Sequence, residues 1–247
     1  MRIVGVDIAT QPKNVGLGLG TLSGGELRVE SVTARESWNA IDAEVGEWLR
    51  SSGGAVLLAL DAPLGWPSEL ASALRGHRAG ASVQPAANAM FRRRTDDVVA
   101  AALGKRPLDV GADRIARTAH AALEFLTRMR RVHGREVPLA WQPGEAEGVS
   151  AIEVYPAGTL ASRGYPSTGY KGTAVVAVEA RAAIIERLRS EMGIPDDAAA
   201  WMRSSDHLLD AALCCLGAAD FMRQEVIAPE DLPRARQEGW IWVSPPR

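Results

Sequence analysis

Two aspartates follow directly on apolar runs in the first quarter of the chain. Asp7 stands at the end of the run that begins at Ile3, and Asp61 comes immediately after Val56–Leu60. If these runs are parallel neighbours in one sheet, their backbones lie about 4.8 Å apart and both carboxylates emerge at the same carboxyl edge. A buried carboxylate there needs a partner, a proton or a metal ion. The alternative is that each aspartate caps a turn, which the proline two residues after Asp61 favours.

A third acidic group lies near the other end of the chain. Asp206, His207 and Asp210 begin a segment that is otherwise apolar nearly all round, which is typical of a buried helix. Their spacings of three and four residues place all three on one helical face. Asp210 lies inside the apolar stretch, where an unpaired carboxylate is rarely tolerated. Alternatively, Asp206 only interacts with the helix dipole and His207 is a surface residue of the first turn.

Carboxylates without a thiolate partner suit hard cations, so these residues favour Mg²⁺ or Mn²⁺ over Zn²⁺. Two such ions about 3.5–4 Å apart can activate a water and stabilise the leaving oxygen in phosphodiester hydrolysis. We therefore predict a two-ion site in which Asp7 bridges the ions, Asp61 binds one and Asp210 binds the other. Asp206 or His207 would complete the ligands of the second ion.

Glu153 is a further acidic candidate, because it stands within a predicted strand and begins a Glu-Val-Tyr-Pro-Ala motif. It could serve as a fourth acidic ligand or orient a water, and the alternative is a structural hydrogen bond before the proline. The predicted catalytic residues are therefore Asp7, Asp61, Glu153, His207 and Asp210.

Charge is unevenly distributed along the 247 residues. The formal net charge of −2 argues against a globally basic nucleic-acid binder. Residues 75–135, however, contain thirteen Arg and Lys against five Asp and Glu. Arginine matches phosphate through paired donors, so this segment could follow a nucleic-acid backbone. The alternative is a solvated arginine face in which Asp96 pairs with Arg93. The predicted substrate contacts are Arg93, Arg94, Thr95, Asp96 and, in a glycine-flanked loop, Lys171.

Hydrophobic periodicity indicates the elements that position these residues. The predicted strands are Ile3–Ile8, Val15–Leu22, Leu27–Thr33, Ala55–Leu60, Ala151–Tyr155 and a small final one at Trp240–Val243. The predicted helices are Asn39–Arg50, Asp113–Val132, Val175–Ser190, Asp196–Arg203 and Asp206–Gln224. Three strands, a helix and a fourth strand favour an α/β fold with a mixed sheet. We expect one domain over residues 1–247, with an Arg-rich helical insertion at about 67–148 between the fourth and fifth strands.

Six motifs occur in an order that resembles domain-of-unknown-function family 429. They are GVDIAT (5–10), LDAPLGWP (60–67), RRTD (93–96), EVYPA (153–157), YKG (170–172) and the helix that carries Asp206 and Asp210. The family is one of predicted nucleases of the ribonuclease H-like superfamily, so the resemblance implies a five-stranded mixed sheet flanked by helices. It extends to the terminal EGWIWVSP (238–245). The spacing of His207 and Asp210 is also similar to that in the site helix of RuvC-type junction resolvases.

Two other function classes are weighed against a nuclease. The first is an actin-like or sugar-kinase-type nucleotide-binding protein, because residues 7–10 followed by Lys13 faintly resemble a first phosphate loop. Gly16, Gly18 and Gly20 form no G-x-G-x-x-G motif, however, and alternating glycines more often let another element pack closely. The second is a non-catalytic binding protein on the same fold. The three acids together argue against it, because buried acids without a ligand would only reduce the stability of the protein.

The remaining observations concern the surroundings of the protein. Its two cysteines, Cys214 and Cys215, are adjacent, which excludes a disulfide framework and a zinc knuckle. No apolar run approaches the length of a membrane span, which is about 18 residues, and the first residues do not show the pattern of a signal peptide. We expect a cytoplasmic protein with a nucleic-acid partner and no membrane partner. The oligomeric state is left open, with a homodimer as one of the alternatives.

Overall fold

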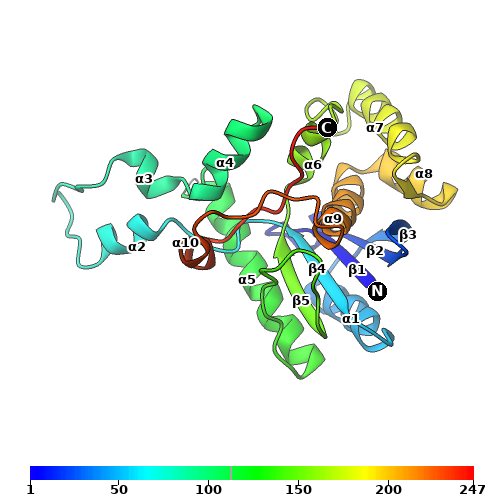
Figure 1. Cartoon of the computed structure of the whole chain (residues 1–247), viewed down its shortest axis with the longest axis horizontal. Helices are drawn as coiled ribbons and strands as arrows, with labels where there is room; N and C mark the ends of the chain where they lie inside the picture. Colours follow the sequence, from blue (N-terminus) through cyan, green and yellow to red (C-terminus); the bar gives the residue numbers. More distant parts are fainter. Residues whose placement is uncertain (112) are drawn as a thin grey trace.

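A computed structural model describes residues 1–111 and 113–247, and its centre is a mixed β-sheet (Figure 1). The strand order is β5-β4-β1-β2-β3-β6. The first three strands form an antiparallel meander. Strand β4 pairs in parallel with β1, and β5 pairs in parallel with β4, which confirms the predicted mixed sheet. These strands are β1 (Arg2–Asp7), β2 (Gly16–Ser23), β3 (Glu26–Ala34), β4 (Val56–Asp61) and β5 (Val149–Glu153).

The prediction of five strands is wrong, because the sheet has six. Strand β6 (Met192–Gly193) pairs in parallel with the edge strand β3. Two residues are too few to show a hydrophobic period, so only the tertiary pairing identifies this strand. The small strand predicted at Trp240–Val243 does not form either. Ile241 makes a single bridge to Glu153 instead, while the tryptophans on both sides of it are buried in the core.

Helices cover both faces of the sheet. Side chains alternate along a strand, so Ile3 joins the core on one face and Val4 the core on the other. Helix α9 (Asp206–Met222) packs on the first face, and helices α1 (Trp38–Arg50) and α5 (Asp113–His133) pack on the second. The remaining helices after β5 are α6 (Pro156–Ser162), α7 (Val175–Leu188), α8 (Asp196–Ser204) and α10 (Leu232–Glu238).

The segment between β4 and β5 divides into a projecting part and a core part. Helices α2 (Ser68–Leu74) and α3 (Ala87–Phe91) form an arm that extends away from the sheet (Figure 1, left). Helices α4 (Arg94–Leu103) and α5 return to the body of the molecule, where α5 supplies Phe125 and Met129 to the core. Within the described residues, no helix is both long enough and apolar enough to cross a membrane.

Candidate metal centre

Asp7 and Asp61 lie side by side at one edge of the sheet. Strands β1 and β4 pair in parallel, and their register places Asp7 directly opposite Asp61. This confirms the sequence-based expectation that the two apolar runs are parallel neighbours. Both strands end here, so the two carboxylates extend past the edge of the sheet.

Two glycines bring helix α9, and with it Asp210, close to these strands. A Cβ atom on Gly5 would lie 2.0 Å from the carbonyl oxygen of Ala211, and one on Gly16 would lie 2.0 Å from that of His207. Any larger residue at either position would therefore push the helix away from the sheet. This contact explains Gly5 and Gly16 as packing residues, as expected for glycines that let another element approach closely.

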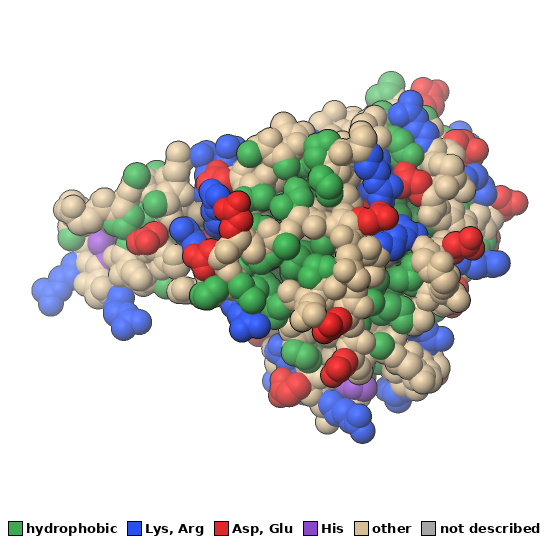
Figure 2. Space-filling view, in the orientation of Figure 1, with side chains coloured by type: hydrophobic (Ala, Val, Ile, Leu, Met, Phe, Trp, Pro, Cys, Tyr) green, Lys and Arg blue, Asp and Glu red, His purple; other side chains and the backbone are tan. Residues whose placement is uncertain are grey.

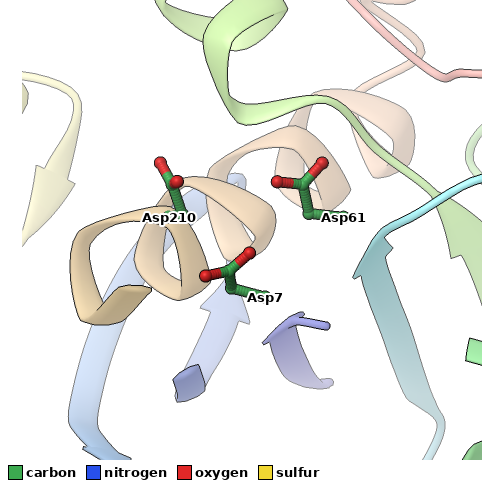
Figure 3. Close-up of side chains that lie close together, drawn as sticks. All are labelled: Asp7, Asp61 and Asp210. Atoms are coloured by element: carbon green, nitrogen blue, oxygen red, sulfur yellow. The ribbon is translucent and has the colours of Figure 1, made fainter. Parts of the chain in front are cut away.

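The three carboxylates converge at this point (Figure 3). Asp7, Asp61 and Asp210 each offer one oxygen, and these oxygens all lie within 4.8 Å of one another. Asp7 and Asp210 are 7% and 1% exposed, and Asp61 is half-buried. We call these three residues the acidic cluster.

Burial makes the charged form of the acidic cluster unfavourable. Desolvation raises the pKa of Asp7, and it raises the pKa of Asp61 well above the usual range, with repulsion from Asp7 adding to the shift. Desolvation also raises the pKa of Asp210 to about 6, although the nearby Lys171 acts in the opposite direction. The hydrogen-bond donors and positive charges around the cluster therefore do not fully offset the cost of burying its negative charge.

The three carboxylates differ in their hydrogen-bond partners. The imidazole of His207 donates from Nδ1 to Asp7 Oδ2 over 2.6 Å, and this bond raises the pKa of His207. The hydroxyl of Tyr170 donates to Asp210 Oδ1 over 2.8 Å. Asp210 Oδ2 is buried and accepts no well-oriented hydrogen bond from the described part of the chain. Nor does any described residue donate to Asp61.

Lys171 is the one lysine or arginine that forms an ion pair with the acidic cluster among the described residues. Its ammonium lies 2.7 Å from Asp210 Oδ2, while its side chain is 58% exposed. The predicted metal ligand Asp206 has a different place: its Oδ2 accepts a hydrogen bond of 3.1 Å from the backbone N–H of Gly172. Asp206 therefore holds the lysine-bearing loop and lies outside the group of converging oxygens.

The acidic cluster opens into a cavity of about 530 Å³. One wall is apolar and comes from the segment between β4 and β5, with Pro107, Leu108 and Ile115. The opposite wall is the loop that carries Tyr170 and Lys171. Lys105 joins the two walls, because its ammonium donates to the carbonyl oxygen of Ser167 over 3.1 Å.

Comparison with known proteins places the chain in a family. Residues 5–234 match the model of a family described as "Protein of unknown function (DUF429)". The chain belongs to this family. The match confirms the family resemblance of the six motifs, and it covers all three residues of the acidic cluster. No curated protein shows a significant match to the chain.

In this family member, Glu153 is held by an arginine and does not join the acidic cluster. The guanidinium of Arg93 donates to both carboxylate oxygens of Glu153, over 2.7 and 2.8 Å, and also to Asp96. The backbone N–H of Leu64 donates to Glu153 as well. Burial raises the pKa of Glu153 and the charge of Arg93 lowers it. The structural alternative for Glu153 is therefore the one observed.

The predicted substrate contacts in the RRTD motif are mostly unavailable. Arg93, Thr95 and Asp96 are at most 1% exposed, and Thr95 accepts a hydrogen bond from the backbone of Ile241. The motif thus fixes the start of α4 against the sheet edge and the carboxyl-terminal segment. Only Arg94 has a largely exposed side chain, at 52%. The polar groups of Arg93, Thr95 and Asp96 are used inside the protein, and of these three only Arg93 lines the cavity, so their contact with substrate stays a prediction that the structure does not support.

Two residues that contribute to the site could not be predicted from the sequence. Tyr170 was part of a recognised motif, and its contact with Asp210 required knowledge of the fold. Arg181 in α7 is fully buried and donates from Nη1 to the carbonyl oxygens of Tyr170 and Gly172, over 2.6 and 2.8 Å. A buried arginine whose acceptors are backbone carbonyls leaves no pairing signal in the sequence. It fixes the backbone on both sides of Lys171.

Proposed function

We propose that the chain is a nuclease that depends on Mg²⁺ or Mn²⁺ and hydrolyses phosphodiester bonds at the acidic cluster. The observation that carries this proposal is the convergence of three carboxylates from β1, β4 and α9 within 4.8 Å. All ligand atoms are carboxylate oxygens, which suits a hard divalent cation. The proposal includes a ribonuclease H-like fold, supported by the three antiparallel and two parallel strands of the main sheet.

The residues present fit a bound cation. Asp61 has no described donor, and the buried Asp210 Oδ2 lacks a well-oriented hydrogen bond. Among the described lysines and arginines, only Lys171, whose ammonium lies 2.7 Å from Asp210 Oδ2, offsets the charge of these groups, and a divalent cation would further reduce the cost of burying them. When bound, a divalent ion would polarise a phosphodiester oxygen and lower the pKa of a water molecule. Asp7, Asp61 and Asp210 would hold it.

The surrounding side chains set the positions of these ligands. His207 fixes the carboxylate of Asp7, and Tyr170 fixes that of Asp210. Such outer contacts orient ligating carboxylates and commonly change metal affinity or activity by about 10–100-fold. Lys171 is exposed enough to reach the charge of a phosphate that enters the cavity.

The cavity and the arm support a nucleic-acid substrate. The apolar wall with Pro107 and Leu108 can accept the flat face of a base or sugar next to the acidic cluster. Arg75 and Arg78 are exposed in the turn between α2 and α3, and Figure 2 shows Lys and Arg side chains at the end of the arm. Arginines so placed could contact phosphates outside the cavity.

Cleavage of labelled oligonucleotides tests this function. Single-stranded and duplex DNA and RNA would be incubated with the full chain and Mn²⁺ or Mg²⁺, with EDTA as the blank. We expect Asp7→Asn and Asp210→Asn to lose about 100-fold or more of the activity, because each removes a charged ligand of the cation. Asp97→Asn is the matched control, since Asp97 is exposed and pairs with Arg106. Cleavage that survives in both site variants, or no cleavage of any substrate, would contradict the proposal.

A further inference from the structure

The acidic cluster already contains a positive charge in a fixed place. Lys171 lies 2.7 Å from Asp210 Oδ2, and Asp7 and Asp61 are close enough for their charges to act on its ammonium. With the three carboxylates ionised, as metal ligands must be, and with His207 neutral, the cluster and the ammonium carry two net negative charges, which one divalent ion neutralises. A second divalent ion would leave the site with an excess of positive charge.

Hydrogen bonds from neighbouring helices hold the loop that carries Lys171 in place. The fully buried Arg181 donates to the carbonyl oxygens of the residues before and after Lys171. The same guanidinium donates to the carbonyl oxygen of Arg203, at the end of the helix before α9. Asp206 in the first turn of α9 accepts from Gly172. The loop is thus tied to the helix that carries Asp210, so the ammonium and the carboxylate are held together.

The groups that a second ion would need are already engaged. The predicted second site used His207 or Asp206 together with Asp7 and Asp210. His207 instead donates to Asp7 Oδ2, and Asp206 accepts from the backbone of Gly172. Among the described residues, Asp7, Asp61 and Asp210 are the only group of three or more His, Cys, Asp or Glu side chains whose ligand atoms converge within 4.8 Å, so no further acidic residue or histidine joins them to complete a second site.

We propose that Lys171 replaces a second divalent ion, so that the acidic cluster binds a single Mg²⁺ or Mn²⁺ with the ammonium of Lys171 beside it. This inference rests on the proposed function and revises the predicted number of ions from two to one. Lys171 is then the second cation of the site, and Arg181 is a positioning residue that acts through the backbone of the lysine loop.

Counting bound Mn²⁺ by titration and electron paramagnetic resonance tests the inference without measuring cleavage. The full chain is expected to bind one Mn²⁺ at the cluster and to give a mononuclear signal. Lys171→Ala should bind a second Mn²⁺ and give the signal of a spin-coupled pair, because a cation's place becomes vacant. Lys171→Arg keeps the positive charge and should bind one. Lys105→Ala is the matched control, a lysine of the same cavity bonded to Ser167, and should also bind one.

The outcomes separate this inference from the proposed function. A spin-coupled Mn²⁺ pair in the parent chain, or a mononuclear signal from Lys171→Ala at saturating Mn²⁺, would overturn the role of Lys171 and leave the metal site standing. No Mn²⁺ bound by the parent would overturn both. Lys171→Ala leaves the buried Asp210 without its counter-charge and should lower the melting temperature, so a melting curve of each variant checks that the protein is folded at the temperature of the titration.

Discussion

Asp61 and Glu153 end neighbouring parallel strands, yet their carboxylates have opposite surroundings. Glu153 receives two hydrogen bonds from Arg93 and one from the backbone of Leu64. Asp61 receives none from the described residues and faces two other aspartates. Position at the edge of a sheet therefore does not distinguish a structural acid from a candidate ligand. The difference lies in the arginine, which donates to both carboxylate oxygens of Glu153, whereas no described residue donates to Asp61.

The largest effect on the free energy of unfolding is expected when Glu153 and Asp96 lose the arginine that binds them. Arg93→Ala leaves both carboxylates buried without their counter-charge, at 3% and 0% side-chain exposure. Removing one partner of a buried ion pair typically lowers the free energy of unfolding by about 3–5 kcal/mol. Denaturant unfolding measures the change. Arg106→Ala, which breaks the exposed pair with Asp97, should change it by less than about 1 kcal/mol. Equal effects of the two variants would remove the contrast.

A somewhat smaller effect is expected from the contact that assembles the acidic cluster. Gly5→Ala places a Cβ 2.0 Å from the carbonyl oxygen of Ala211, so α9 must shift. Overpacking of this kind typically lowers the free energy of unfolding by about 1–3 kcal/mol. Because Asp210 moves with the helix, Mn²⁺ affinity should fall as well. Gly53→Ala is a control, since its Cβ would meet nothing within 4 Å. Unchanged Mn²⁺ affinity in Gly5→Ala would contradict the geometry of the site.

Asp210→Asn should raise the stability of the metal-free protein at pH 7.5. Burial in the folded protein raises the pKa of Asp210 to about 6, above its usual value of 3.8. A raised pKa of an acid contributes stability below pH 3.8 that is lost as the pH rises through about 6. At pH 7.5 the ionised Asp210 therefore opposes folding, and asparagine should relieve this by at most about 3 kcal/mol, because the shift to about 6 already includes the attraction of Lys171.

Replacing the neighbouring acid, Glu153, should change the free energy of unfolding in the opposite direction. The pKa of Glu153 is raised by burial as well, but Glu153→Gln also leaves the fully buried Arg93 without one of its two counter-charges. This loss should outweigh the relief of burying the carboxylate, so the variant should lower the free energy of unfolding at the same pH. Thermal melts of Asp210→Asn and Glu153→Gln, without metal, compare the two directly. A loss of stability in both variants would show that Asp210 is a structural acid like Glu153.

The smallest effect is a dependence of Mn²⁺ affinity on pH. A proton on Asp210 competes with the ion, so affinity should be constant well above pH 6 and fall about tenfold for each further pH unit below it. Burial also raises the pKa of Asp7 and Asp61, which makes the fall steeper. Titrations between pH 5 and 8 measure this. Affinity that does not change over this range would place the ion elsewhere.

Much of this arrangement could be predicted from the sequence, because it depends on local patterns. Apolar runs that end in Asp7 and Asp61 indicated neighbouring strands, and an apolar helix interrupted by Asp210 indicated a buried acid. The predicted family is also confirmed. Charges alone could not show that Arg93 pairs with Glu153, 60 positions away, rather than with phosphate. Nor could periodicity show the two-residue β6 or the carbonyl contacts of Arg181.

The position of a bound Mn²⁺ tests the central claim most directly. Crystals of the full chain grown with Mn²⁺ at pH 7.5 would be measured at a wavelength where manganese scatters anomalously. We predict an anomalous peak between the carboxylates of Asp7, Asp61 and Asp210, and no such peak in crystals of Asp210→Asn. A peak beside Glu153, or saturating Mn²⁺ with no peak at the acidic cluster, would contradict the claim that the acidic cluster forms a metal site.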